Sequence, residues 1–271
     1  MRLRAAFTAM TVALLLAGNA AASGWTIPAE SYYLKIWDRT LIGSVGFDRQ
    51  GEKVELPGSY QDHALNIYFE YGIDYDWTLT VFSRPVGFAA VADKRTAYMG
   101  QTVVGVRRAL LRRPFGLTAE LRYGYAPALG DAPLSASIEG GELRYYSATE
   151  STHRVDLEVG AGWGLGWGWL STRIGARYLS EFDPVLFGGA QFGVNTDVGF
   201  IASIFADFHE PLASLQRSNF SGAGETRYIG YGADFSYWFS PHFAISAGVA
   251  GAFLVESNAS TPNLSLGFEF R

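Results

Sequence analysis

Residues 260–271 at the end of the sequence read Ser-Thr-Pro-Asn-Leu-Ser-Leu-Gly-Phe-Glu-Phe-Arg. In this stretch every second residue is large and apolar, namely Leu264, Leu266, Phe268 and Phe270. Such alternation gives a strand one apolar face for lipid and one small or polar face for a lumen. We therefore expect the last strand of an outer-membrane barrel, whose four apolar residues face lipid and act as an assembly signal. Arg271, one residue further, is expected to reach periplasmic water.

The first residues have the pattern of an export signal. Arg2 and Arg4 form a positive segment, residues 5–18 are almost entirely apolar, and the alanines at 20–22 suit cleavage. We expect a signal peptide over residues 1–22 and a barrel over 23–271. The apolar run is too short to span a bilayer, and no later stretch reaches the length of a transmembrane helix.

Composition narrows the classes of protein further. The chain has no cysteine, so an exported fold must hold without disulfides. The net charge is −5 and no basic tract stands out, which argues against nucleic acid as a partner. Aromatic residues make up 15% of the chain and glycines number 32, which suits the aromatic girdles and tight bends of a membrane barrel. No cofactor is expected.

Strand-like alternation recurs along the whole chain. Twelve segments show it, at 32–39, 63–72, 77–84, 100–110, 115–125, 153–163, 167–179, 185–194, 198–209, 227–238, 243–255 and 264–270. Each is about ten residues long, as a tilted strand needs to cross the hydrocarbon layer. The sequence therefore predicts an all-β, antiparallel, up-and-down transmembrane barrel, closed by pairing of the last strand with the first.

The links between these segments alternate in length. Short links fall near residues 74, 113, 165, 196 and 240, and long ones at 40–62, 85–99, 126–152 and 210–226. The links at 180–184 and 256–263 are more modest in length, and one case makes the alternation weak. Outer-membrane barrels have short periplasmic turns and longer extracellular loops. An even strand number then leaves both termini in the periplasm, with outer-membrane lipid and the barrel-insertion machinery as expected partners. The oligomeric state stays open.

A soluble β-sandwich is the competing architecture, because its strands also alternate. Its apolar faces point inward, however, and its polar faces point to water. Here the charged face also carries small glycines and opposed charges, while aromatics gather at the strand ends. This pattern favours lipid outside and a polar interior.

The N-terminal part of the expected barrel resembles a known family. The matching stretches are Gly24-Trp25-Thr26-Ile27-Pro28, Tyr33-Leu34-Lys35, Leu56-Pro57-Gly58, residues 63–73 and Trp77-Thr78-Leu79, with a weaker match from Phe192 to Asp207. They are similar to outer-membrane proteins of the MetA pathway of phenol degradation, which are related in outline to channels for fatty acids and aromatic hydrocarbons. The resemblance implies a passive channel for small, hydrophobic or aromatic molecules. A long N-terminal plug is not expected, because few residues precede the first strand.

Charged residues on the non-lipid face are the candidate lining of the pore. They are Lys35, Glu70, Arg84, Glu120, Arg122, Asp156, Glu158, Arg173, Arg177, Asp207 and Asp234. An Arg or Lys facing lipid near the midplane would cost about 2–4 kcal/mol, so the alternation directs these residues inward. Acids and bases are nearly balanced, which leaves two interpretations open: a narrow pore, or an interior filled by charge pairs.

A non-transporting barrel, structural or lipid-hydrolysing, is the alternative function. Barrel lipid hydrolases use a histidine and a serine on the rim. The chain has four histidines, His63, His153, His209 and His242, and we identify no serine at cross-strand spacing from them. They are interpreted as rim residues, so the sequence predicts no catalytic residue and no enzyme.

Two short motifs resemble ligand sites. Asp48-Arg49-Gln50-Gly51 resembles the start of a calcium loop, but the later ligands are missing. The glycine-rich residues 160–166 resemble a dinucleotide fingerprint, but no βαβ unit follows, so a turn between strands is expected. No metal site is predicted.

Overall fold

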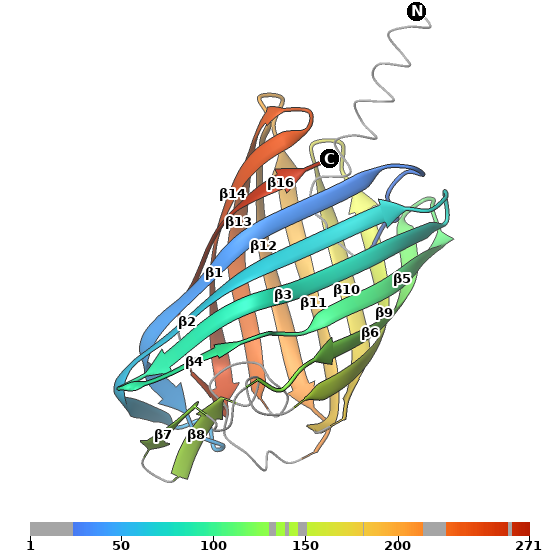
Figure 1. Ribbon diagram of the computed structural model, residues 1–271. Helices are drawn as coiled ribbons and strands as arrows, with labels where there is room; N and C mark the ends of the chain where they lie inside the picture. Colours follow the sequence, from blue (N-terminus) through green and yellow to red (C-terminus); the bar gives the residue numbers. More distant parts are fainter. Residues whose placement is uncertain are drawn as a thin grey trace, which may run out of the picture.

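The chain winds into a closed antiparallel β-barrel in the computed structural model (Figure 1). The structure describes residues 24–129, 134–138, 141–145, 151–180, 182–213, 226–259 and 262–271. The signal peptide expected over residues 1–22 lies outside these ranges. In the described residues no helix is long and apolar enough to cross a membrane.

Twelve strands pass round the barrel, as the alternation predicts. They are β1 (Tyr32–Phe47), β2 (Lys53–Gly72), β3 (Trp77–Val91), β5 (Thr102–Leu111), β6 (Gly116–Ala126), β9 (Thr152–Gly164), β10 (Gly168–Leu179), β11 (Phe182–Asn195), β12 (Phe200–Pro211), β13 (Arg227–Ser240), β14 (Phe243–Glu256) and β16 (Asn263–Phe270). Each pairs with its neighbours in this order, and β16 pairs with β1 to close the ring.

Short additional strands extend one end of the barrel. They are β4 (Lys94–Tyr98), which pairs with β3, the hairpin of β7 (Leu134–Ile138) and β8 (Gly141–Tyr145), and β15 (Asn258–Ala259), which pairs with β1. The links predicted to be short are turns of two to four residues, and they lie at the same end of the barrel as the C-terminus, toward the top and right of Figure 1. The link predicted at 180–184 differs, because β10 and β11 stay paired as far as Leu179↔Phe182 and only two residues lie between them. The predicted short links are therefore confirmed, but the alternation of short and long links is not strict.

Two stretches expected as loops are strand for much of their length. The link predicted at 40–62 is largely strand, because β1 and β2 stay paired from Tyr32↔Tyr71 to Phe47↔Lys53, with a bulge between Gly43 and Val45. The link predicted at 85–99 likewise contains the end of β3 and all of β4. Backbone pairing continues here although the alternation of side chains fades, since a ladder satisfies N–H and C=O groups whatever the residue type.

The two faces of the barrel differ as a membrane requires. Leu121 and Leu157 are paired on the outer surface, and each is 59% exposed. The next pair, Glu120 and Glu158, faces inward and is 2% and 1% exposed. An apolar exterior around a polar interior is the reverse of a soluble sandwich. The structure therefore confirms the expected membrane barrel and contradicts the soluble β-sandwich.

Closure of the barrel depends on β16. It lies between β14 and β1, and Phe270 is paired with both Phe243 and Leu34. Leu264, Leu266 and Phe268 are exposed on the outer surface, and the Phe270 ring lies 5.5 Å from that of Phe243. An open edge in hydrocarbon would leave several backbone groups unpaired at several kcal/mol each, so this strand is needed for a stable barrel.

We expect Phe270→Ala to lower the amount of protein in the outer membrane far more than Ser265→Ala. The first change removes an aromatic contact at the closing strand, whereas the second alters a lumen-facing hydroxyl on the same strand. Immunoblots of fractionated membranes at equal synthesis measure the difference. Equal insertion of both variants would show that the terminal aromatic is not an assembly signal.

Candidate functional site

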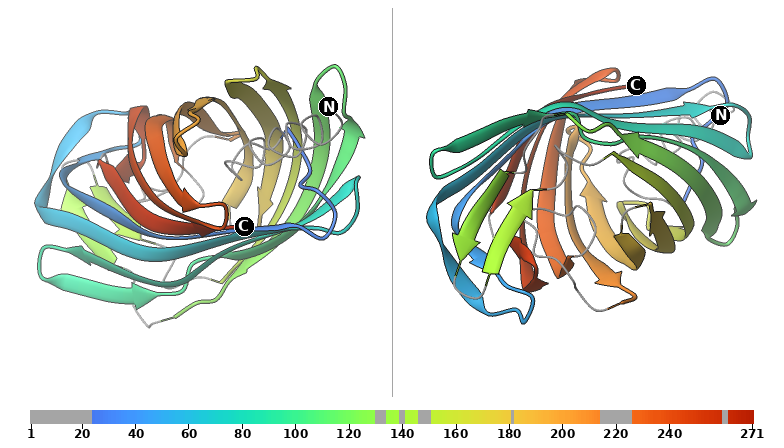
Figure 2. Two further views of the ribbon diagram at one scale, coloured as in Figure 1. Left: turned by 90° about the horizontal axis from the view of Figure 1, so that it is seen from above. Right: turned by 60° about the horizontal axis from the view of Figure 1, so that its bottom comes forward.

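A cavity of about 390 Å³ lies inside the barrel, and each of the twelve spanning strands contributes at least one lining residue. A cavity lined from all sides in this way lies on the barrel axis. Viewed along that axis, β1 to β3 form a flatter wall and the strands coloured yellow to red curve round the other side (Figure 2). Of the residues predicted to line a pore, Lys35, Arg122, Glu158, Arg173 and Asp234 border this cavity.

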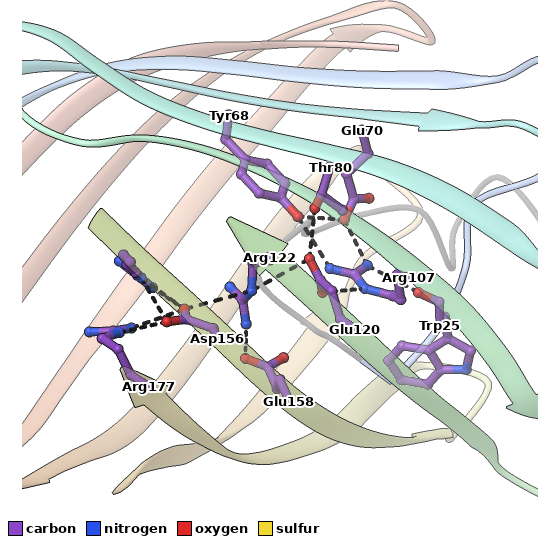
Figure 3. Close-up of polar contacts among 11 residues, drawn as sticks. Trp25, Tyr68, Glu70, Thr80, Arg107, Glu120, Arg122, Asp156, Glu158 and Arg177 are labelled. Carbon is purple, nitrogen blue, oxygen red and sulfur yellow. Dashed lines mark hydrogen bonds and ion pairs between the residues drawn. The ribbon is translucent and has the colours of Figure 1, made fainter. Parts of the chain in front are cut away.

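One ion cluster, which we call the Arg107 cluster, joins β2, β3, β5 and β6 (Figure 3). Arg107 is 4% exposed and donates to Glu70 Oε1 and Glu120 Oε2, each at 2.8 Å. The Thr80 hydroxyl donates to Glu120 Oε1 at 2.7 Å, and the Tyr68 hydroxyl donates to Glu70 Oε1 at 2.6 Å. Charges held this far from water need such dense pairing, because an unpaired buried carboxylate is costly.

A second cluster, around Asp156, continues along the same wall on β6, β9 and β10 (Figure 3). Asp156 accepts from the Arg154 Nε at 2.8 Å and from the Arg177 Nε at 3.0 Å. Arg122 pairs with Glu158 and lies 3.6 Å from Glu120, so it links the two clusters. Together the clusters make a continuous polar wall from β2 to β10.

The remaining predicted residues are more isolated. Arg84 donates to the Asn66 Oδ1 at 3.0 Å, and Lys35 lies 3.3 Å from Glu269. In the described part of the chain, Arg173, Asp207 and Asp234 make neither a hydrogen bond nor an ion pair. The interior therefore contains paired charges along one wall and free charges elsewhere, with a cavity between them.

Several residues of this interior were not among the predicted ones. They are Arg39, Asp62, Arg107, Arg154 and Glu269. The alternation of side chains could have indicated Arg107. Val104 and Val106 face outward, so Arg107, which follows Val106, faces inward. Arg108 comes directly after Arg107, so both faces of the strand carry an arginine at this point. Such a pair is typical of a strand end in water and hides the alternation.

A smaller network lies toward the long-loop end, where β4 packs on the barrel. Asp62 accepts from Arg39 Nη2 at 2.7 Å and from the Tyr98 hydroxyl at 2.6 Å. Burial raises the pKa of Tyr98, and the Asp62 charge raises it further. The hydroxyl thus stays protonated as a donor, which ties β4 to β2.

The residues before β1 enter the mouth of the barrel at the end with the short turns. Arg107 Nη1 donates to the Trp25 carbonyl at 3.1 Å, and Trp25 packs against the buried cluster of Trp169 and Ile201, as Trp238 also does. A Cβ on Gly162 would lie 2.5 Å from the Trp25 ring, so only glycine admits it there. No long plug was expected, yet this short segment narrows the mouth, because the missing side chain at Gly162 leaves room for the Trp25 ring inside the wall.

Arg271 lies at the same mouth. Its guanidinium is 3.5 Å from the centre of the Trp238 ring, and its side chain is half-buried. The expectation that Arg271 reaches periplasmic water is therefore wrong. A planar guanidinium stacks on indole with a favourable cation–π contact, which holds it inward.

The histidine rings have partners that do not include a serine, as far as the structure describes the chain. His63 contacts the Thr40 hydroxyl at 3.0 Å, and His153 contacts the Tyr123 hydroxyl at 2.8 Å. His209 is buried against the Thr226 carbonyl, and His242 lies 2.8 Å from the Arg271 carbonyl.

The two motifs that resemble ligand sites are turns. The Asp48 carboxylate accepts from the backbone N–H groups of Gln50 and Glu52, which closes a tight turn between β1 and β2. The glycine-rich run contains the turn between β9 and β10, where Gly166 has a φ of +82°. Within the described residues no group of histidines or carboxylates could hold a metal ion.

Comparison with known proteins identifies relatives by fold. No protein-family model matches the chain, and no curated protein matches it by sequence. The COG4313 outer membrane channel from Pseudomonas putida F1 superposes with a TM-score of 0.64 at 12% identity, covering 91% of this chain and 97% of that one. The translocator domain of the autotransporter NalP from Neisseria meningitidis gives 0.55 at 13%, covering 89% and 88%.

A mutant of the TodX monoaromatic hydrocarbon channel gives a TM-score of 0.47 at 9% identity, covering 95% of this chain and 93% of that one. The expected fold is thus confirmed by the strand pairing and by the superpositions on the COG4313 channel and the NalP translocator domain. The chain has the closed, membrane-spanning barrel fold of outer-membrane proteins.

Proposed function

We propose that the protein is a passive channel of the outer membrane through which small molecules cross. The observation that carries the proposal is the axial cavity, because a space bordered by every spanning strand lies along the axis of the barrel, where a solute would cross. The structurally similar Pseudomonas protein is also described as an outer membrane channel. Export by a cleaved signal over residues 1–22 and membrane insertion from the periplasm belong to the same proposal.

The cargo we propose is a small molecule with an apolar or aromatic part. Tyr33, Trp37, Tyr68, Phe82 and Phe205 all border the cavity. Aromatic side chains offer large flat contacts to a ring-bearing solute, while the charged residues keep the path wet. The resemblance of the N-terminal region to outer-membrane proteins of the MetA pathway of phenol degradation, related in outline to channels for fatty acids and aromatic hydrocarbons, supports this choice.

A non-transporting barrel is the second candidate, and the ion clusters favour it. Networks as dense as that around Arg107 rigidify a wall and fill space that a solute would need. The arrangement of the histidine contacts gives no support to a lipid hydrolase, and we propose that the protein is not an enzyme.

Conductance separates the candidates. We expect purified protein, shown to be folded by faster migration on gels before boiling than after, to give discrete current steps in planar bilayers. Liposomes that contain it should swell faster in phenol-like solutes than in sugars of similar size. Equal swelling in sugars would indicate a general porin. Absence of current together with turnover of phospholipid would contradict the channel and support a hydrolase.

A further inference from the structure

The lining of the axial cavity divides into an aromatic and a cationic part. Four of the five aromatic lining residues lie on β1 to β3, where the Trp37 and Phe82 ring centroids are 6.1 Å apart, and the fifth, Phe205, lies on β12. The cationic part lies on β5, β6 and β10, with Arg107, Arg122 and Arg173. In the ring of paired strands β10 lies halfway round from β1, so Arg173 and Trp37 border the cavity from opposite walls.

Cations outnumber acids at the cavity. Lys35 joins the three arginines, and only Glu158 and Asp234 are acidic. Lys35, Arg107 and Arg122 each contact a carboxylate of the barrel wall. In the part of the chain that the structure describes, the Arg173 guanidinium has no such partner.

The wall around Arg173 leaves this guanidinium accessible. Its neighbours across the two adjacent strands are Gly160 on β9 and Gly189 on β11, so no side chain flanks it. Asp207 follows one strand further on and acts on Arg173 only at longer range, without an ion pair. A guanidinium presents paired N–H donors whose geometry matches a carboxylate, and such bonds are about twice as strong as neutral ones.

We infer that the axial cavity binds a small aromatic carboxylate, with the carboxylate on Arg173 and the ring against Trp37 and Phe82. The inference rests on the proposed channel function and specifies the chemical class of its cargo. The cavity volume of about 390 Å³ suits such a ligand, since pockets for small molecules span about 300–1,000 Å³. The aromatic side chains select for the ring, and Arg173, which has no ion pair with a carboxylate of the described residues, selects for the negative charge.

Calorimetric titration of the purified full chain in detergent tests the inference, with benzoate, benzyl alcohol and acetate as probes. We expect benzoate to bind more tightly than either of the others. Arg173→Gln should weaken benzoate binding about tenfold, the loss expected for a charge-assisted hydrogen bond, and leave benzyl alcohol nearly unchanged. Trp37→Leu should weaken benzoate and benzyl alcohol together.

Arg112→Gln is the matched control, because Arg112 carries the same group on an exposed periplasmic turn. Gel migration before boiling confirms that each variant is folded. Equal binding of benzoate and benzyl alcohol, or an unaltered benzoate affinity in Arg173→Gln, would overturn the inference in favour of a neutral aromatic site. Acetate binding as tight as benzoate would overturn it in favour of a general anion site.

Conductance keeps the two proposals apart. If the protein conducts and admits uncharged solutes but does not bind benzoate, the channel proposal stands and this inference is wrong. If the protein binds benzoate through Arg173 but never conducts, the binding site stands and the channel proposal is wrong.

Discussion

Trp25→Ala is expected to raise single-channel conductance several-fold. Trp25 packs against Trp169 and Ile201 inside the mouth at the short-turn end, and the segment that carries it is bonded to Arg107 through the Trp25 carbonyl. Loss of the ring removes the bulk that narrows this end and the packing that keeps the segment inside. Pore diameter sets passage of solutes, so current should rise. Single-channel recordings in planar bilayers measure the change.

Gly162→Leu should produce the same increase by a different route. A side chain at that position would overlap the Trp25 ring, since a Cβ alone would lie 2.5 Å from it. Trp167→Ala is the matched control, because Trp167 is 57% exposed on the outer surface near the same end of the barrel. Wild-type conductance in both Trp25→Ala and Gly162→Leu would show that the segment before β1 does not limit flow.

Arg107→Gln is expected to lower the free energy of unfolding by about 3–5 kcal/mol, the cost of removing one partner from a buried ion pair. Arg107 is paired with both Glu70 and Glu120, and each of these glutamates is 2% exposed. Without the guanidinium, two carboxylates remain close together and shielded from water. Denaturant titration of the protein in phospholipid vesicles, followed by tryptophan fluorescence, measures the loss.

Arg108→Gln is the control for this change. Arg108 is the next residue, points outward and lies 5.2 Å from the Trp77 ring, so its loss should change stability much less. The triple variant with Glu70→Gln and Glu120→Gln should recover much of the stability, because amides leave no buried charge. Equal stability of Arg107→Gln and Arg108→Gln would mean that the cluster is solvated and not structural.

For the membrane-spanning part of each strand, the sequence predicts which residues face lipid and which face the interior. A strand in a bilayer meets lipid on one face all along its length, so its own residues must alternate, as in Leu121 and Tyr123 against Glu120 and Arg122. The alternation is local and therefore readable in a single segment. It fails at 40–62, where the strands rise beyond the expected spanning segment and no lipid enforces the pattern.

The candidate site was only partly predictable. Alternation directs Glu70 and Glu120 inward, but it does not reveal that Arg107 joins them, since the pairing depends on the register of β2, β5 and β6. The position of Trp25 inside the mouth could not be predicted, because the segment before β1 has no alternation of apolar and polar residues to indicate which way its side chains face.

The sequence by itself therefore determined the class of fold, the strand order and which face of each strand meets lipid, because those follow from the contact of each residue with its solvent. The tertiary structure alone decided which charges pair, which stay free and what narrows the mouth. Arg107 bonds Glu70 from 37 residues away and Trp25 from 82 residues away. Contacts of such separation arise only when the barrel closes and sets every strand in register with its neighbours.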